Sequence, residues 1–125
     1  MRAAVGIVDI EVEGQDGEAL DAEGARRFEE GDVAGAREYF ERAALAPGRR
    51  DVDHWDNLGI ARFMAGDYAL AVMPLLKVVS EEPDREQSSR LLVSAAFLSG
   101  RQADGARWLA DYERRFGPHP AGWSR

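Results

Sequence analysis

One local pattern occurs three times in this chain, and this repetition limits its possible folds more than any other feature. The glycines Gly31, Gly66 and Gly100 are 35 and 34 residues apart, and each opens a similar turn segment (31–36, 66–71 and 100–105). A Phe stands three residues before each glycine, and a large apolar residue stands nine residues after it. A fixed interval of this size indicates one supersecondary unit copied along the chain, in which no copy can bury its apolar face alone.

Within each copy the apolar residues follow a helical period, and the turns mark the helix ends. At 31–32 and again at 66–67, Gly supplies the left-handed turn that ends one helix and Asp caps the next. We expect Asp51 to cap the third helix and Pro83 to stand in the first turn of the fifth. The pattern predicts an all-α fold of three antiparallel helix pairs, with helices over 18–30, 33–46, 52–65, 68–81, 84–99 and 102–116.

Pro74 lies inside the fourth expected helix, where it removes a backbone hydrogen bond and presses on the carbonyl of Leu70. We expect a kink at this point. The kink would be either a bend on the solvent side or a change in the shape of a binding surface.

Composition limits the chain to one compact domain and excludes several functions. With 125 residues and 45% apolar composition it can build a single core. No apolar run approaches the ~18 residues of a membrane-spanning helix, and neither a signal peptide nor a membrane role is expected. The chain contains no Cys, which is typical of the cytoplasm. The net charge of −7 is concentrated in residues 1–23, and no basic face that could follow nucleic acid is present.

Two terminal segments differ from the repeats. Residues 1–16 carry apolar residues that alternate loosely with acids, and this segment is either an acidic tail without structure, a strand laid in a groove, or an edge shared with another molecule. A Pro- and Gly-containing tail occupies 118–125. The repeat domain is therefore expected to span 17–117.

The second copy resembles a tetratricopeptide repeat. Its pattern of Trp55-x-x-Leu58-Gly59, Gly66-Asp67-Tyr68, Ala71-x-x-x-Leu75 and Pro83 stands at the spacing of that family. In the first copy Leu20 replaces the Trp, although Gly24, Ala36, Phe40 and Ala43 agree. In the third copy Ser89, Val93 and Gly105 replace the Trp, the first Gly and the central Ala. The family's aromatic residue is missing from all three copies, where Arg27, Arg62 and Ala96 stand instead.

The resemblance implies a right-handed superhelix, an α-solenoid, whose concave groove is lined by the first helix of each pair. That groove would be acidic toward the N-terminal repeat and apolar toward the C-terminal one. Asp21 and Asp53 stand where the family's carboxylate-binding clamp has cations, so chaperone-tail binding is not expected. The groove suits an apolar segment carrying Lys or Arg. Its expected partner-binding residues are Asp21, Phe28, Asp53, Asp56, Asn57, Ile60, Phe63, Met64, Arg90 and Phe97. The three Phe have a second interpretation as ordinary packing between helices.

A second candidate surface lies on the last expected helix. Trp108, Tyr112 and Phe116 recur every four residues, and no further helix is expected to cover them. An exposed aromatic face of this kind would support a homodimer. Alternatively, Trp123 folds back over the stripe, or part of the stripe packs inward.

Candidate catalytic groups are few. His54 and His119 are the only histidines, and neither has a partner at the spacing of metal ligands. Asp53 and Asp56 flank a first helical turn, where carboxylates interact favourably with the helix dipole. We expect no enzyme activity, cofactor or metal. The sequence predicts a cytoplasmic interaction module that binds a protein or peptide, and the alternative is a scaffold that associates through its last helix or its N-terminal segment.

Overall fold

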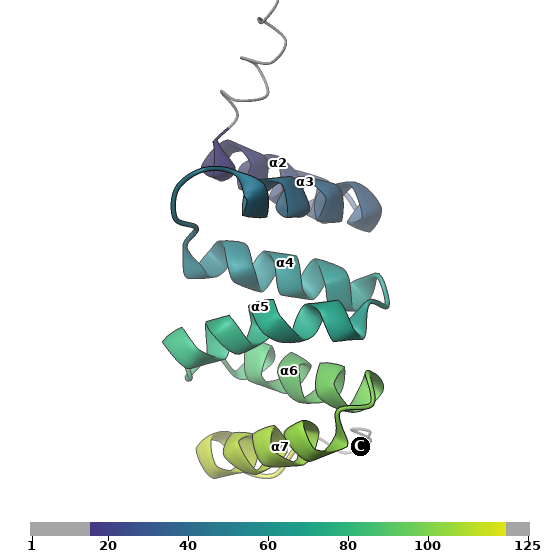
Figure 1. Cartoon of the computed structure of the whole chain (residues 1–125), viewed down its shortest axis with the longest axis vertical. Helices are drawn as coiled ribbons and strands as arrows, with labels where there is room; N and C mark the ends of the chain where they lie inside the picture. The colour runs from purple at the N-terminus through teal and green to yellow at the C-terminus, as the bar shows by residue number, and fades with distance from the viewer. Residues whose placement is uncertain (1–15, 120–125) are drawn as a thin grey trace, which may run out of the picture.

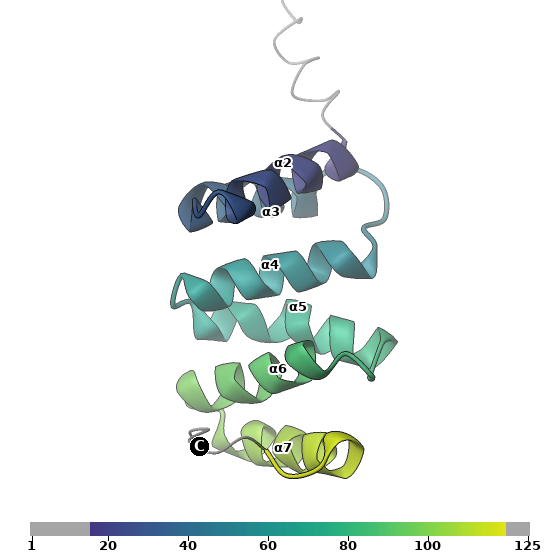
Figure 2. The same ribbon diagram turned by 180° about the vertical axis from the view of Figure 1, so that it is seen from behind.

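The computed structural model of the protein describes residues 16–119, and within this range the chain forms only α-helices (Figure 1). They stack in chain order along the long axis of the molecule, and the same order is seen from behind (Figure 2). The expected all-α solenoid of three antiparallel pairs is confirmed. The helices are α2 (Gly17–Glu29), α3 (Val33–Leu45), α4 (Val52–Met64), α5 (Tyr68–Glu81), α6 (Glu86–Leu98) and α7 (Gln102–Phe116).

Some of the expectations concern residues outside the described range. Of the N-terminal segment 1–16 only Asp16 is described, so the expectations for that segment lie outside the described residues. Trp123 and the tail beyond His119 also lie outside them.

Glycine turns connect the two helices of each pair. Gly31, Gly66 and Gly100 adopt positive φ angles of 87°, 86° and 86°, which favour a residue without a Cβ. The caps at Asp32 and Asp51 form as predicted. The carboxylate of Asp32 accepts a hydrogen bond from the backbone N–H of Gly35 at 2.9 Å, and that of Asp51 accepts one from His54 at 2.9 Å. These local interactions explain why the helix ends can be predicted so closely.

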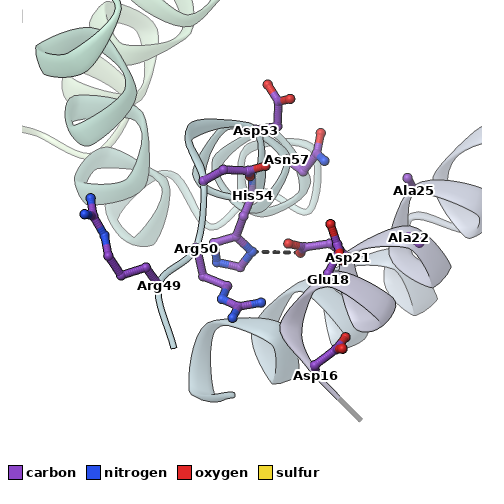
Figure 3. A pocket seen from close by; sticks show the side chains of 11 residues that line it. Asp16, Glu18, Asp21, Ala22, Ala25, Arg49, Arg50, Asp53, His54 and Asn57 are labelled. Atoms are coloured by element: carbon purple, nitrogen blue, oxygen red, sulfur yellow. Dashed lines mark hydrogen bonds and ion pairs between the residues drawn. The ribbon is translucent and has the colours of Figure 1, made fainter. Parts of the chain in front are cut away.

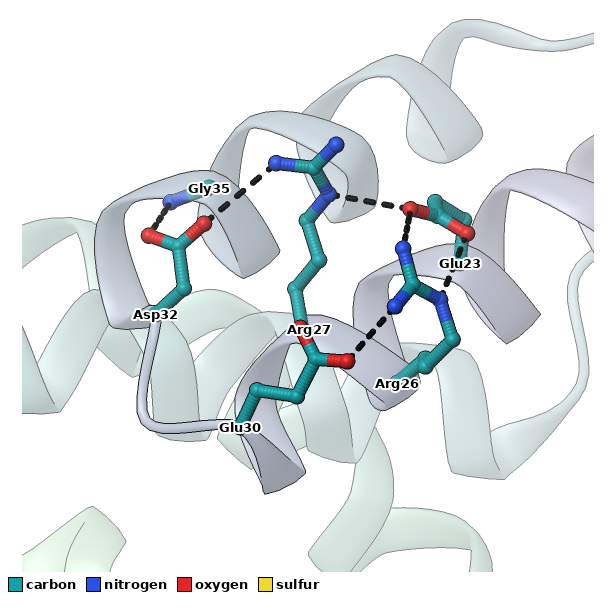
Figure 4. A network of polar contacts seen from close by, with 6 residues as sticks. All are labelled: Glu23, Arg26, Arg27, Glu30, Asp32 and Gly35. Carbon is teal, nitrogen blue, oxygen red and sulfur yellow. Dashed lines mark hydrogen bonds and ion pairs between the residues drawn. The ribbon is translucent and has the colours of Figure 1, made fainter.

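A series of ion pairs joins α2 to the glycine turn that follows it (Figure 4). Glu23 accepts hydrogen bonds from Arg26 and from Arg27, and Arg27 reaches on to Asp32 at 3.3 Å. The two guanidinium groups lower the pKa of Glu23 to about 2. Because these side chains are exposed, we assign them little weight in holding the fold.

Two of the predicted helix starts need correction. Asp67 occupies the N-cap position of α5, but its side chain makes no capping hydrogen bond and instead binds Arg37 of α3. The fifth helix begins at Glu86 rather than at 84, so Pro83 precedes the helix instead of standing in its first turn. Glu82, the residue before the proline, leaves the helical conformation with φ −135° and ψ 77°, as a residue in that position tends to do.

Pro74 is buried, and α5 continues through it as one helix. Because proline has no N–H, the carbonyl of Leu70 loses its helical donor. Arg62 of α4 supplies a replacement, since its Nη1 donates to the Leu70 carbonyl at 2.8 Å. The same guanidinium binds Glu41 of α3 through two hydrogen bonds of 2.8 and 2.6 Å. One side chain therefore compensates the proline and ties the first pair to the second.

Two of the buried apolar clusters join neighbouring pairs rather than lying within one pair. Phe40 of α3 packs with Leu58 of α4, and Leu75 of α5 packs with Leu92 of α6. Each of these residues is at most 1% exposed. Such burial between neighbours is how stacked repeats obtain a core that none has alone. Among residues 16–119, none of the helices combines the length and apolar character that crossing a bilayer requires.

Candidate functional site

A hollow of about 630 Å³ lies between α2, α4 and the segment that leads into α4. It opens beside the first turns of the two helices, so side chains from different repeats face one another across it (Figure 3). Three of the predicted groove residues, Asp21, Asp53 and Asn57, are brought together here. The lining is completed by Asp16, Glu18, Ala22, Ala25, Arg49, Arg50, Asp51 and His54.

Acidic groups dominate this lining, with five carboxylates against the two guanidinium groups of Arg49 and Arg50. Two of the carboxylates have structural roles as helix caps: Asp51 as described above, and Asp16, which accepts from the Ala19 N–H at 2.8 Å. Glu18 and Asn57 make no hydrogen bond or ion pair within residues 16–119. Arg49 makes none within this range either. The carboxylate of Glu18, the amide of Asn57 and the guanidinium of Arg49 are therefore side-chain groups of the hollow that a ligand could use without breaking a contact among residues 16–119.

His54 belongs to the wall of the hollow and is only 1% exposed. Its Nδ1 lies 2.7 Å from Oδ1 of Asp21, which links α4 to α2. Its Nε2 is buried and has no hydrogen-bond partner among the described residues. The wall of the hollow thus contains a buried polar atom that no residue of the range 16–119 satisfies.

Asp53 and Asp56 bind the next repeat rather than acting only on their own helix. Arg85 donates to Asp53 at 2.8 Å and to Asp56 at 3.1 Å, and the hydroxyl of Ser88 donates to Asp56 at 2.8 Å. The hydrogen bonds to Asp53 and then to Glu82 raise the pKa of Arg85 above its usual value. The sequence-based interpretation of this acidic pair as a favourable charge at a helix start missed this bridge to α6.

The two bridges repeat the same joint. Asp56 stands on α4 where Asp21 stands on α2, and Ser88 stands on α6 where His54 stands on α4. The first and second repeats therefore each offer an Asp from their first helix to a side chain in the first turn of the following repeat, whereas Arg90 stands at this position of the third. We call the pairs Asp21–His54 and Asp56–Ser88 the inter-repeat joints.

The remaining predicted groove residues differ in how far they are exposed. Phe28, Phe63 and Phe97 are each partly buried against one of the apolar clusters, as ordinary packing would require. Ile60 is half-buried, and Arg90 pairs with Glu86 at 3.1 Å. Met64 is 57% exposed. Whether a partner uses these residues stays a prediction.

The aromatic stripe of α7 lies partly inside the molecule. Tyr112 is 5% exposed, and its hydroxyl donates to Glu86 of α6 at 2.6 Å. This hydrogen bond, together with Arg90, lowers the pKa of Glu86, whereas burial and the same carboxylate raise the pKa of Tyr112. Trp108 and Phe116 are half-buried. Of the alternatives, inward packing describes Tyr112, and self-association through the other two stays a prediction.

Two residues central to this region were not foreseen as such. His54 was expected to lie at a helix start, but it is buried and pairs with Asp21, which is 33 positions away. Glu18 belongs to the groove lining that the resemblance implies, and Arg85 gave only a weak signal. Arg85 could have been noticed because it stands where the earlier repeats have the capping residues Asp16 and Asp51.

Among residues 16–119 no group of three or more His, Asp or Glu side chains is arranged to hold a metal ion. Comparison of the chain with known protein families matches no family model, and comparison with curated proteins finds no match.

Proposed function

We propose that this chain is a non-catalytic interaction module that binds a peptide or helix of a partner protein in the groove along α2, α4 and α6. The observation that carries the proposal is the acidic hollow between α2 and α4, in which Glu18 and Asn57 make no hydrogen bond or ion pair with any other residue of the range 16–119. Binding there needs no chemistry, because burial and charge complementarity are sufficient to recognise a segment with basic residues.

Two features of the chain support this reading. Its three stacked helical pairs resemble tetratricopeptide repeats, most closely in the second copy. The titratable groups of the hollow are also largely committed to structural contacts: Asp16 and Asp51 cap helices, Asp21 pairs with His54, and Asp53 binds Arg85. Because cysteine-free chains are typical of the cytoplasm, we propose that compartment as the location.

The test is a display library of random 12-residue peptides panned against the immobilised full chain. We expect enriched peptides to carry Lys or Arg, and we expect Glu18→Lys to weaken their binding about tenfold or more, which corresponds to ~1.4 kcal/mol. Glu38→Lys is the matched control, because Glu38 is also exposed but lies on α3 and makes no contact within the described residues.

Both substitutions change the charge by the same amount, and circular dichroism checks that each variant keeps its helices. The proposal fails if no peptide is enriched, or if Glu18→Lys and Glu38→Lys alter binding equally. Substituting Phe28 or Phe63 would be a poorer test, because both pack on the core and their loss would also destabilise the fold.

A further inference from the structure

One face of α4 changes character along its length. Asp53, Asn57, Ile60 and Met64 are spaced by four, three and four residues, so they form one stripe on the helix. The stripe begins at the acidic hollow and ends at an exposed thioether. The two ends therefore offer different chemistry to a ligand that lies along the helix.

The acidic end requires a group that donates hydrogen bonds and carries positive charge. Within residues 16–119 the carboxylate of Glu18 makes no hydrogen bond or ion pair, so it can accept from a ligand. The other carboxylates of the hollow add to the negative potential even though they are already bonded. An ammonium or guanidinium group meets these requirements, because the five carboxylates of the lining outnumber the guanidinium groups of Arg49 and Arg50.

The opposite end requires an apolar group. Met64 is 57% exposed, and Leu98, which holds the same position on α6, is 51% exposed. The two helices are in contact, and Met64 and Leu98 occupy equivalent positions in successive repeats. Methionine adapts its shape to apolar side chains that dock on it.

The distance between the two ends sets the spacing of the ligand. Asp53 and Met64 are eleven positions apart, which corresponds to ~16 Å along a helix axis. An extended peptide rises ~3.3 Å per residue, so about five residues cover this distance. We propose that the ligand of the groove is an extended peptide segment with a Lys or Arg and a large apolar residue about five positions apart, the basic group at the hollow and the apolar group at Met64 and Leu98. This inference rests on the proposed groove function and specifies its partner.

The test uses an array of peptides in which one Arg and one Leu are separated by two to nine positions, in both orders, within a Gly, Ser and Ala background. The array is probed with the labelled full chain, and the best peptides are measured by fluorescence polarisation. We expect binding to peak near a separation of five. We also expect Met64→Ser to weaken binding of those peptides about tenfold and to flatten the dependence on separation.

Met73→Ser is the matched control. Met73 is 63% exposed but lies on α5, outside the stripe, and its substitution should leave the peak unchanged. The inference is overturned if no array peptide binds, if binding does not depend on the separation, or if Met73→Ser weakens binding and Met64→Ser does not. The failure of the groove function itself would look different, because binding would then be insensitive to Glu18→Lys whatever the separation.

Discussion

At the scale of single residues, Arg62 has two roles that few surface arginines combine. It is bound to Glu41 of the preceding repeat and to the Leu70 carbonyl that Pro74 leaves without a donor. Proline in a helix interior costs ~3 kcal/mol when nothing replaces the lost hydrogen bond. Arg62 therefore explains how α5 tolerates a buried proline.

A double-mutant cycle tests this explanation. We expect Arg62→Gln to lower the free energy of unfolding by ~1–2 kcal/mol in the parent chain. In a Pro74→Ala chain the new N–H can serve the Leu70 carbonyl, so the same substitution should cost less. Urea denaturation followed by circular dichroism measures both values. Equal costs in the two backgrounds would show that Arg62 does not compensate the proline.

Glu41 predicts a dependence of stability on pH. The hydrogen bonds from Arg62, and to a lesser extent from Arg37, lower its pKa in the folded chain below the ordinary 4.5. A carboxylate with a lowered pKa stabilises the fold above its unfolded pKa, and this stabilisation is lost as the pH falls through the folded pKa. We expect Glu41→Gln to lower the melting temperature by a few degrees at pH 7.

The difference between Glu41→Gln and the parent should shrink as the pH falls below 4.5 towards the lowered pKa of the folded carboxyl, where the parent carboxyl becomes protonated. Thermal melts between pH 7 and pH 3 measure it. Glu38→Gln, on the same helix but without a contact in the described range, should follow the parent throughout. If the difference in melting temperature between Glu41→Gln and the parent stays constant from pH 7 to pH 3, the assignment of a lowered pKa to Glu41 is wrong.

At the scale of the elements, close helix packing depends on glycines inside helices. Gly59 of α4 faces Leu75 of α5, and a Cβ added at Gly59 would lie 2.7 Å from Cγ of that buried leucine. Gly24 and Gly105 face the rings of Phe40 and Phe97 in the same manner. In each pair, the two helices therefore come close to one another at one glycine.

Gly59→Ala gives the corresponding prediction. Alanine favours a helix over glycine by ~1 kcal/mol, but overpacking against Leu75 costs ~1–3 kcal/mol. We expect the substitution to be neutral or destabilising in the parent chain, by urea denaturation. In a Leu75→Ala chain, where the space is open, it should stabilise. Stabilisation of the same size in both backgrounds would show that Gly59 is not needed for the approach.

The element boundaries could be predicted almost entirely from the sequence because their causes are local. Glycine turns and the caps Asp32 and Asp51 act within four residues, and the expected and observed helices differ by at most two residues at each end. Of the two errors, that at Pro83 has a local cause, whereas that at Asp67 arose because a distant residue competed. Asp67 binds Arg37 instead of capping its helix.

The site was less predictable for the same reason. The face and three residues of the hollow followed from the repeat pattern, but the partners of these residues did not. His54 pairs with Asp21 across 33 positions and Arg85 with Asp53 across 32. No local pattern reveals which carboxylates take part in such long-range pairs. Nor does it reveal which, like that of Glu18, make no hydrogen bond or ion pair within residues 16–119.

At the scale of the whole molecule, the positions of the two inter-repeat joints predict which helices open more often when one joint is removed. In stacked repeats each unit is stabilised mainly by its neighbours. We expect Asp21→Ala to speed amide hydrogen exchange in α2 and α3 more than in α6 and α7, and Asp56→Ala to do the opposite. Hydrogen exchange read by mass spectrometry measures both. Uniform acceleration over all six helices in either variant would show instead that the array opens as one unit.

The middle repeat contributes one residue to each inter-repeat joint. His54 pairs with Asp21 of the preceding repeat, and Asp56 accepts a hydrogen bond from Ser88 of the following one. A second copy of residues 52–85 inserted after Arg85 would therefore meet the first through an Asp–His pair of the kind already present at Asp21. A four-repeat version of the chain should therefore fold, and the groove along the first helices of its repeats should be longer.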